Sequence, residues 1–313
     1  LVYSGATVGW TPASDIVSAD EPVAPPTQKA IFGYGTTGSV VSMSNLVNSS
    51  GVIATDVTGV GSAREALAAA TYGLDKAIFG YGNTGSRVSL TNLVSNSGVV
   101  ATDTTGVGTA RDGLAAAAYG IDKAIFAYGQ TADAKVSLSN LVSNSGVVAS
   151  DVSGVGSARS SLAAAGYGTD KAIFGYGSTG SDVSLTNLVS NTGVVSADVS
   201  GVGTARRILA ATSYGTDKAI FGFGWNGSSY LSITNLVNSS GVVAADVSGV
   251  GTIRRGLSAA GYGGDKAIFA YGNTGSASSL SNLVNSSGVV ASDVSGVGTA
   301  RNDLAAAGYS SSA

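Results

Sequence analysis

The chain has 313 residues, a formal net charge of −3, and a charged fraction of 11%, against roughly 25% in typical soluble domains. This charge provides no basic surface for nucleic acid, and no apolar run approaches the roughly 20 residues of a membrane-spanning helix. Cysteine and histidine are absent, which excludes disulfides, thiolate or imidazole metal ligands, and catalytic triads that need either residue.

Residues 1–28 come first and do not match the rest of the chain. They contain Trp10 and the proline-rich stretch from Pro22 to Pro26, which predict an extended N-terminal arm and spacer. The chain begins at Leu1 and its only methionine is Met43, so we expect that processing or an incomplete sequence hides the true start. We predict that this arm docks the protein onto other protein subunits.

Residues 29–313 consist of a sequence that returns six times with few changes. A fixed period of this size is typical of a propeller, a solenoid or an array. The glycine-punctuated apolar runs are of strand length, so the repeats predict an all-β protein. The lysine that marks each copy falls at Lys29, Lys76, Lys123, Lys171, Lys218 and Lys266.

Each repeat predicts four short strands, which in one copy are Leu114 to Ala118, Lys123 to Tyr128, Val136 to Val142, and Val147 to Val152. The first strand is rich in alanine, as expected where several sheets crowd around an axis. The second is apolar at consecutive positions, which predicts a strand covered on both faces.

The two ends of the repeat region indicate how it closes. The chain enters the first repeat at its second strand, Lys29 to Phe32, and ends with a sixth alanine-rich strand, Leu304 to Tyr309. The last strand therefore supplies the strand that the first repeat lacks. This predicts a six-bladed β-propeller of four-stranded blades without a free sheet edge. The alternative is a linear stack of β-coils, which more often carries atypical capping repeats, and none is seen.

The order of these features resembles the kelch propeller repeat. In that family a glycine pair ends the second strand and an arginine precedes the first, and here Gly80-Tyr81-Gly82 and Arg64 match those positions. The outer tryptophan of the family is missing from every copy. The resemblance implies a propeller fold. The near-identical repeats also resemble proteins of marine phages and algal viruses, which implies a virion or extracellular location.

Every repeat carries the motif Asp-x-[Ser/Thr]-Gly-Val-Gly-x-x-Arg, and an asparagine inside the third strand. The motif is either a ring of carboxylates for a cation or sugar, or an aspartate that accepts turn N–H bonds or pairs with an arginine across a loop. Six copies favour the structural interpretation, since active sites are usually single. The asparagine predicts a bond to neighbouring backbone. The motif pairs are Asp56/Arg64, Asp103/Arg111, Asp151/Arg159, Asp198/Arg206, Asp246/Arg254 and Asp293/Arg301.

Differences between the copies gather in the loop after the second strand and in the residue after each motif arginine. In the loops, Trp225 with Tyr230 is the strongest candidate for binding, because exposed aromatic side chains are typical anchors. Arg87 and Lys135 in other loops, and Trp10 in the arm, are further candidates.

These patterns predict a non-enzymatic structural or attachment module without a cofactor or metal, in an extracellular or virion assembly, and without nucleic-acid binding or membrane insertion. The alternative is a carbohydrate-binding propeller that recognises surface glycans. In that alternative a repeated aromatic ring would stack on the sugar, and the only rings that recur in every copy are those of Tyr34, Tyr81, Tyr128, Tyr176, Phe223 and Tyr271.

Overall fold

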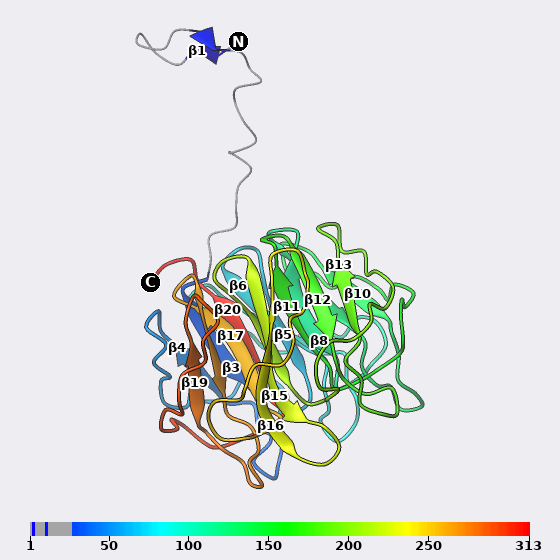
Figure 1. Ribbon diagram of the computed structural model, residues 1–313, viewed down its shortest axis with the longest axis vertical. Helices are drawn as coiled ribbons and strands as arrows, with labels where there is room; N and C mark the ends of the chain where they lie inside the picture. The colour runs from blue at the N-terminus through cyan, green and yellow to red at the C-terminus, as the bar shows by residue number, and fades with distance from the viewer. Residues whose placement is uncertain (1, 4–9, 12–26) are drawn as a thin grey trace.

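The computed structural model describes residues 2–3, 10–11 and 27–313 (Figure 1). Over these residues the fold is all-β, with six three-stranded antiparallel sheets and one two-stranded pair. The two-stranded pair joins β1 (Val2–Tyr3) to β2 (Trp10–Thr11). The other residues of the predicted arm up to 26 lie outside the described part of the chain, and no helix in the described part is long and apolar enough to cross a membrane.

Each three-stranded sheet has an inner, a middle and an outer strand, in that spatial order. The inner strands are β5 (Ala68–Tyr72), β8 (Ala115–Tyr119), β11 (Ala163–Tyr167), β14 (Ala210–Tyr214), β17 (Ser258–Tyr262) and β20 (Ala305–Tyr309). The middle strands are β3 (Lys29–Gly33), β6 (Lys76–Gly80), β9 (Lys123–Ala127), β12 (Lys171–Gly175), β15 (Lys218–Trp225) and β18 (Lys266–Ala270). The outer strands are β4 (Ser44–Val47), β7 (Thr91–Val94), β10 (Ser139–Val142), β13 (Thr186–Val189), β16 (Tyr230–Val237) and β19 (Ser281–Val284).

The first sheet combines the two ends of the repeat region. Its order is β20-β3-β4, and Ala307 of β20 lies opposite Ile31 of β3. In Figure 1 the red strand β20 accordingly lies beside the blue strand β3. The predicted pairing of Leu304 to Tyr309 with the first repeat is therefore confirmed, over Ala305–Tyr309.

The prediction of a fourth strand in each sheet is wrong. In the first repeat, the segment that follows β4 makes only two isolated bridges, Ile53 to Val47 and Val57 to Ser44. From one bridge to the other, the segment advances by four residues and β4 by three. The segment therefore has one extra residue that interrupts the ladder, as in a β-bulge. The side chain of Asn45 also donates to the carbonyl of Ala54 at 3.0 Å. We call these segments, 51–61 in the first repeat and their equivalents, the peripheral segments.

The burial of the strands follows their sequence. Ile31 and Phe32 of the middle strand are both fully buried, which confirms that this strand is covered on both faces. The inner strand β5 instead alternates buried and half-buried residues. Inner strands of successive sheets contact one another, and β20 also contacts β5. The alanines of all six inner strands line one narrow cavity of about 120 Å³, which larger side chains would fill.

Backbone hydrogen bonds join neighbouring sheets at both ends of the inner strands. We call the end that carries the Tyr-Gly-x-Asp turns the turn face, and the opposite end the loop face. On the loop face six bonds pass from sheet to sheet and return to the first: Ala66 N to Asp303 O, Gly113 N to Ala66 O, Ser161 N to Gly113 O, Ile208 N to Ser161 O, Gly256 N to Ile208 O, and Asp303 N to Gly256 O. All six residues have a positive φ, which turns their N–H toward the neighbouring sheet.

The turn face has an equivalent set of bonds, in which the residue after each inner-strand tyrosine, a glycine in five sheets and Ser310 in the sixth, donates to the next sheet. Gly73 N donates to Asp122 O, Gly263 N donates to Gln28 O, and Ser310 N donates to Asp75 O. Gln28 and Thr27, which the sequence assigns to the arm, thus accept bonds from the last sheet, Thr27 from Gly264 N at 3.1 Å.

Candidate functional site

The motif arginines form the most extensive polar network of the described residues. Arg111 is fully buried, and its guanidinium lies 4.3 Å above the centre of the Tyr81 ring in the preceding sheet. It donates Nε to the carbonyl of Tyr128 at 2.8 Å, Nη1 to the carbonyl of Thr109 at 3.1 Å, and Nη2 to Oδ1 of Asn140 at 2.6 Å. Because Tyr128 and Asn140 belong to the next sheet, each arginine joins two sheets.

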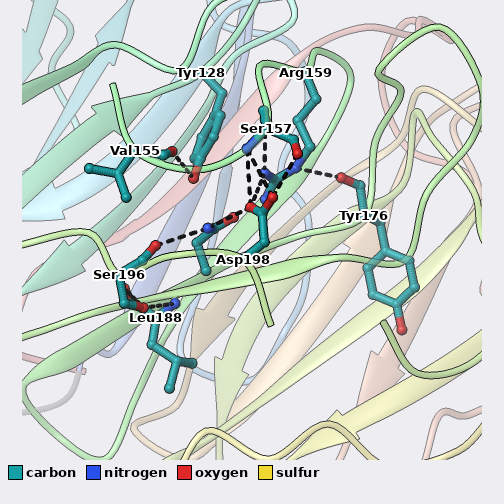
Figure 2. A network of polar contacts seen from close by, with 9 residues as sticks. Tyr128, Val155, Ser157, Arg159, Tyr176, Leu188, Ser196 and Asp198 are labelled. Carbon is teal, nitrogen blue, oxygen red and sulfur yellow. Dashed lines mark hydrogen bonds and ion pairs between the residues drawn. The ribbon is translucent and has the colours of Figure 1, made fainter. Parts of the chain in front are cut away.

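The strand asparagines and the motif aspartates complete this network. Asn140 donates Nδ2 both to the carbonyl of Ala149 at 3.0 Å and to Oδ1 of Asp151 at 2.9 Å. The predicted backbone bond of the asparagine is therefore confirmed. Asp151 also accepts from the backbone N–H and the hydroxyl of Thr109. Figure 2 shows the equivalent contacts around Arg159, where Ser157 bonds to Asp198 and the hydroxyl of Tyr128 donates to Val155.

The aspartate and the arginine of one motif do not pair with each other. Arg111 faces Asp151 of the following repeat at 3.8 Å, and Arg301 faces Asp56 of the first repeat at 4.0 Å. The glycine that ends Gly-Val-Gly makes this approach possible. Gly108 has φ +74°, and a Cβ there would lie 2.6 Å from Nδ2 of Asn140. The motif therefore links successive repeats, as a structural role requires.

The repeated rings proposed to stack on sugars lie inside this network. Tyr81 is fully buried, and its hydroxyl donates to the carbonyl of Val107 at 3.1 Å. One face of the ring carries the guanidinium of Arg111. The ring also contacts Phe126 of the next sheet, in a tilted arrangement with ring centres 5.2 Å apart. The same arrangement recurs at the other five positions, where Phe223 lacks the hydroxyl bond, so these rings have no face for a sugar.

The network shifts the pKa values of its members. Burial lowers the pKa of Arg254 to about 10, which leaves it charged at neutral pH. Burial also acts to raise the pKa of Asp103, but hydrogen bonds from Ser62 and Asn92 and the charge of Arg64 outweigh it, so this pKa lies below its usual value. Asp103 is therefore ionised, and its carboxylate is engaged in hydrogen bonds within the protein.

The variable residues meet in pairs on the loop face, each pair across the boundary between two sheets. Arg87 forms an ion pair with Asp112 at 3.1 Å, and Lys135 donates to the hydroxyl of Ser178 at 3.2 Å. Asp182 pairs with Arg207 at 2.8 Å. In each pair, a residue of the loop after the middle strand of one sheet contacts the following sheet. The contact is made either to the residue that follows the motif arginine or to the residue that forms a β-bridge with it.

Trp225 and Tyr230 instead pair within one sheet and change the local structure. They lie opposite each other where β15 and β16 are extended, so Trp225 ends a strand and is not in a loop as predicted. Their ring centres are 5.2 Å apart, and Arg255 of the next sheet lies 5.7 Å from the ring of Trp225 and 5.3 Å from that of Tyr230. The hydroxyl of Tyr230 reaches Oδ1 of Asn273 at 3.4 Å. Both rings are half-buried.

The predicted binding residues therefore do not gather in one site. Arg87, Lys135 and Trp225 lie on three different sheets of the loop face, each in contact with the next sheet. Trp10 lies in β2, outside the three-stranded sheets. The aromatic pair with Arg255 is the most distinctive feature, because only this sheet extends both its middle and outer strands to eight residues.

Sequence reasoning missed an acidic pair on the loop face, beside the starts of the inner strands. Glu65 and Asp303 line a loop-face depression of about 250 Å³ whose floor is made by leucines of the inner-strand ends, such as Leu67. Burial raises the pKa of Asp303 against the hydrogen bond from Asn302, and burial and the charge of Asp303 raise the pKa of Glu65. The sequence signal for Glu65 was the variation in the residue after each motif arginine, whereas Asp303 lies two residues after Arg301. Opposite, on the turn face, lies a depression of about 430 Å³.

Replacing Asp303 with asparagine should stabilise the fold at neutral pH. A carboxyl whose pKa is raised by folding contributes stability that is present below its unfolded pKa, about 3.9, and is lost as pH rises through the folded value. Asparagine carries no charge and therefore avoids this loss of stability as pH rises. It also tolerates the positive φ at this position. Urea unfolding of Asp303→Asn should show a gain at pH 7 that disappears toward pH 4.

The matched control is Asp293→Asn, the same change at a carboxyl whose pKa is lowered. Burial opposes this lowering, but bonds from Thr252 and Asn282 and the charge of Arg254 prevail. Its contribution is present above the unfolded pKa and is lost as pH falls through the folded value. Asp293→Asn should therefore destabilise the protein at pH 7. Equal effects of the two substitutions would contradict the assignment.

No family model and no curated protein matches this chain. Within the described residues no group of three or more acidic side chains is placed to hold a metal ion. A functional proposal must therefore rest on the arrangement of the side chains.

Proposed function

We propose that the six sheets are the blades of a closed six-bladed β-propeller, and that this disc is a non-enzymatic structural or attachment module. In this proposal the N-terminal arm docks the disc onto other protein subunits of an extracellular or virion assembly. The pairing of β20 with β3 and the two sets of inter-sheet bonds support the ring. A closed ring explains why the bonds from the last repeat return to the first.

One observation carries the functional part of the proposal. The polar residues that recur in the motif, which would otherwise be the candidates for chemistry, bond to one another across the sheet boundaries, as the contacts of Arg111, Asn140 and Asp151 illustrate. Their charges are thus used to hold sheets together. A rigid disc with its polar groups engaged internally suits a role as a building block.

The carbohydrate-binding alternative has less support. The six recurring rings are buried, so a sugar would have to use Trp225 and Tyr230, which occur on a single sheet and already contact Arg255. Glycan-array binding that is lost on Trp225→Ala would favour this alternative over the structural role.

The test of the docking role is deletion of the arm up to residue 26, because Thr27 and Gln28 bond to the last sheet and should be kept. Tagged full-length and truncated chains are expressed in the cells that naturally make the protein, and the two are compared by size fractionation. The full chain should run with the large assembly, and the truncated chain should run free while melting at the same temperature. A truncated chain that still enters the assembly would show that the arm is not the tether.

A further inference from the structure

The first sheet breaks a charge pattern that the other five sheets share. In every sheet the lysine that begins the middle strand lies opposite the tyrosine that ends the inner strand, as Lys76 lies opposite Tyr72. In five sheets the residue before this lysine is an aspartate that pairs with it. Asp75 Oδ1 lies 2.9 Å from Lys76 Nζ, and the other four pairs are 2.8–3.4 Å apart. Each of these ammonium groups is therefore neutralised by a carboxylate beside it.

The first sheet lacks this carboxylate. Gln28 stands where the other repeats have the aspartate, and Lys29 makes no ion pair with any described residue. Lys29 lies opposite Tyr309, which is 2% exposed and whose hydroxyl has no hydrogen-bond partner among the described residues. Burial raises the pKa of Tyr72 and the charge of Asp75 raises it further, whereas burial alone raises the pKa of Tyr309. A positive charge and a hydroxyl donor thus lie together, with no carboxylate of the described residues within ion-pair distance.

Lys29 and Tyr309 line a groove of about 630 Å³ on the turn face, which we call the first-sheet groove. Leu46 and Val52 give this groove an apolar part. Asn48 also lines it, and because Oδ1 of Asn48 accepts from the backbone N–H of Val52 at 3.0 Å, its NH2 group is left to donate elsewhere. The groove therefore combines one cation and several polar donors with an apolar surface, as ligand sites commonly do.

We propose that the first-sheet groove binds a carboxylate of the N-terminal arm, supplied by Asp20 or Glu21. This carboxylate takes the position that the aspartate holds in the other five sheets, and it accepts from Nζ of Lys29 and from the hydroxyl of Tyr309. The five internal pairs show that a lysine in this setting binds a carboxylate, and such charge-assisted bonds are the strong ones. The residues that follow the acidic pair, Pro22-Val23-Ala24, are apolar and suit the apolar part of the groove.

Two observations favour the arm over a separate partner. Residues 29–313 hold sixteen acidic and sixteen basic residues, so the whole net charge of −3 belongs to residues 1–28, which contain no lysine or arginine. The arm also joins the sheets beside the groove, because Gln28 directly precedes Lys29. A segment tethered this closely has an effective concentration on the order of millimolar, which a separate protein seldom reaches. The assignment does not rest on the attachment role, since a held arm fixes where the chain leaves the sheets, whatever its first residues bind.

The experiment measures the binding of a fluorescein-labelled peptide that copies residues 18–24, by fluorescence anisotropy. The arm variant, Asp20→Asn with Glu21→Gln in the full chain, should bind this peptide. The native chain should bind it at least about tenfold more weakly, because its own tethered segment competes. In the arm variant, Lys29→Met should weaken binding about tenfold or more, the effect of losing one hydrogen bond to a charged group. Lys76→Met makes the same change in charge and is the control, which should leave binding unchanged because its ammonium already has a partner.

Gln28→Asp in the arm variant is a second test that keeps Lys29. It restores the aspartate of the other repeats and should also weaken binding about tenfold or more, because the new carboxylate occupies the ammonium. The same peptide with its two carboxylates replaced by amides should not bind. Circular dichroism checks that each variant keeps the fold.

Three results would overturn the proposal: no binding by the arm variant, equal binding by the native chain and the arm variant, or equal losses for Lys29→Met and Lys76→Met. Blocking of the peptide only at concentrations where the native chain associates in sedimentation velocity would point to the arm of a second copy, and would also overturn it. Because no other protein is present, the outcome is independent of whether the arm is a tether.

Discussion

Removing residues 302–313 should strongly destabilise the fold. This deletion takes away β20, which pairs with β3 and contacts both β17 and β5, and it removes the bonds of Asp303 and Ser310 to neighbouring sheets. It exposes the edge of β3 and the apolar surface beside it. At about 25 cal/mol per Å² over a few hundred Å², the loss is several kcal/mol, comparable with the stability of a typical domain.

Thermal melts followed by circular dichroism, together with light scattering, measure this effect. The truncated chain should aggregate or melt at a much lower temperature. Deletion of 311–313, three exposed residues at the end of the chain, is the control and should leave the melt unchanged. A circular permutant that opens at the exposed tip Thr84-Gly85 should also fold, because it keeps all six inner strands. A truncated chain that melts like the full one would instead favour an open stack.

Replacing Arg111 with methionine should cost about 2–6 kcal/mol of unfolding free energy, because it leaves two buried acceptors unpaired at about 1–3 kcal/mol each. The substitution leaves the carbonyl of Tyr128 and Oδ1 of Asn140 without their donor, and it removes the positive charge that lies 3.8 Å from the carboxylate of Asp151. Arg111→Lys should also destabilise, since one ammonium group cannot make these bonds and stack on a ring.

Arg87→Met is the matched control in chemical denaturation. Its side chain is 26% exposed and pairs with Asp112 in the solvated loop face, so its loss should cost less than about 1 kcal/mol. Similar losses for the two substitutions would mean that the motif arginines do not hold the sheets together. The proposed structural role would then lose its main support.

The repeat pattern by itself determined the strand order and the composition of the first sheet. Periodicity identifies the elements, and consecutive apolar residues such as Ile31 and Phe32 require cover on both faces. The chain also begins and ends its repeats at complementary points, so the pairing of β20 with β3 was readable without coordinates.

Only the tertiary structure decided which repeated polar groups meet. Arg64 has a candidate aspartate on either side in the chain, and proximity in sequence favours Asp56. The structure pairs it with Asp103 because its segment runs between two sheets and its side chain crosses to the next one. The burial of Tyr34 beneath this arginine follows from the same crossing, and no local pattern encodes it.

The peripheral segments and the loop-face contacts were likewise beyond sequence reasoning. The alternation around Ile53 has the pattern of a strand, but the count of residues between its two bridges exceeds that of the partner by one, and register is a property of both strands together. Contacts such as Arg87 with Asp112 join side chains of different sheets, so their pairing depends on how the sheets lie side by side. Periodicity determines the elements within a repeat, whereas the contacts between repeats are decided by packing.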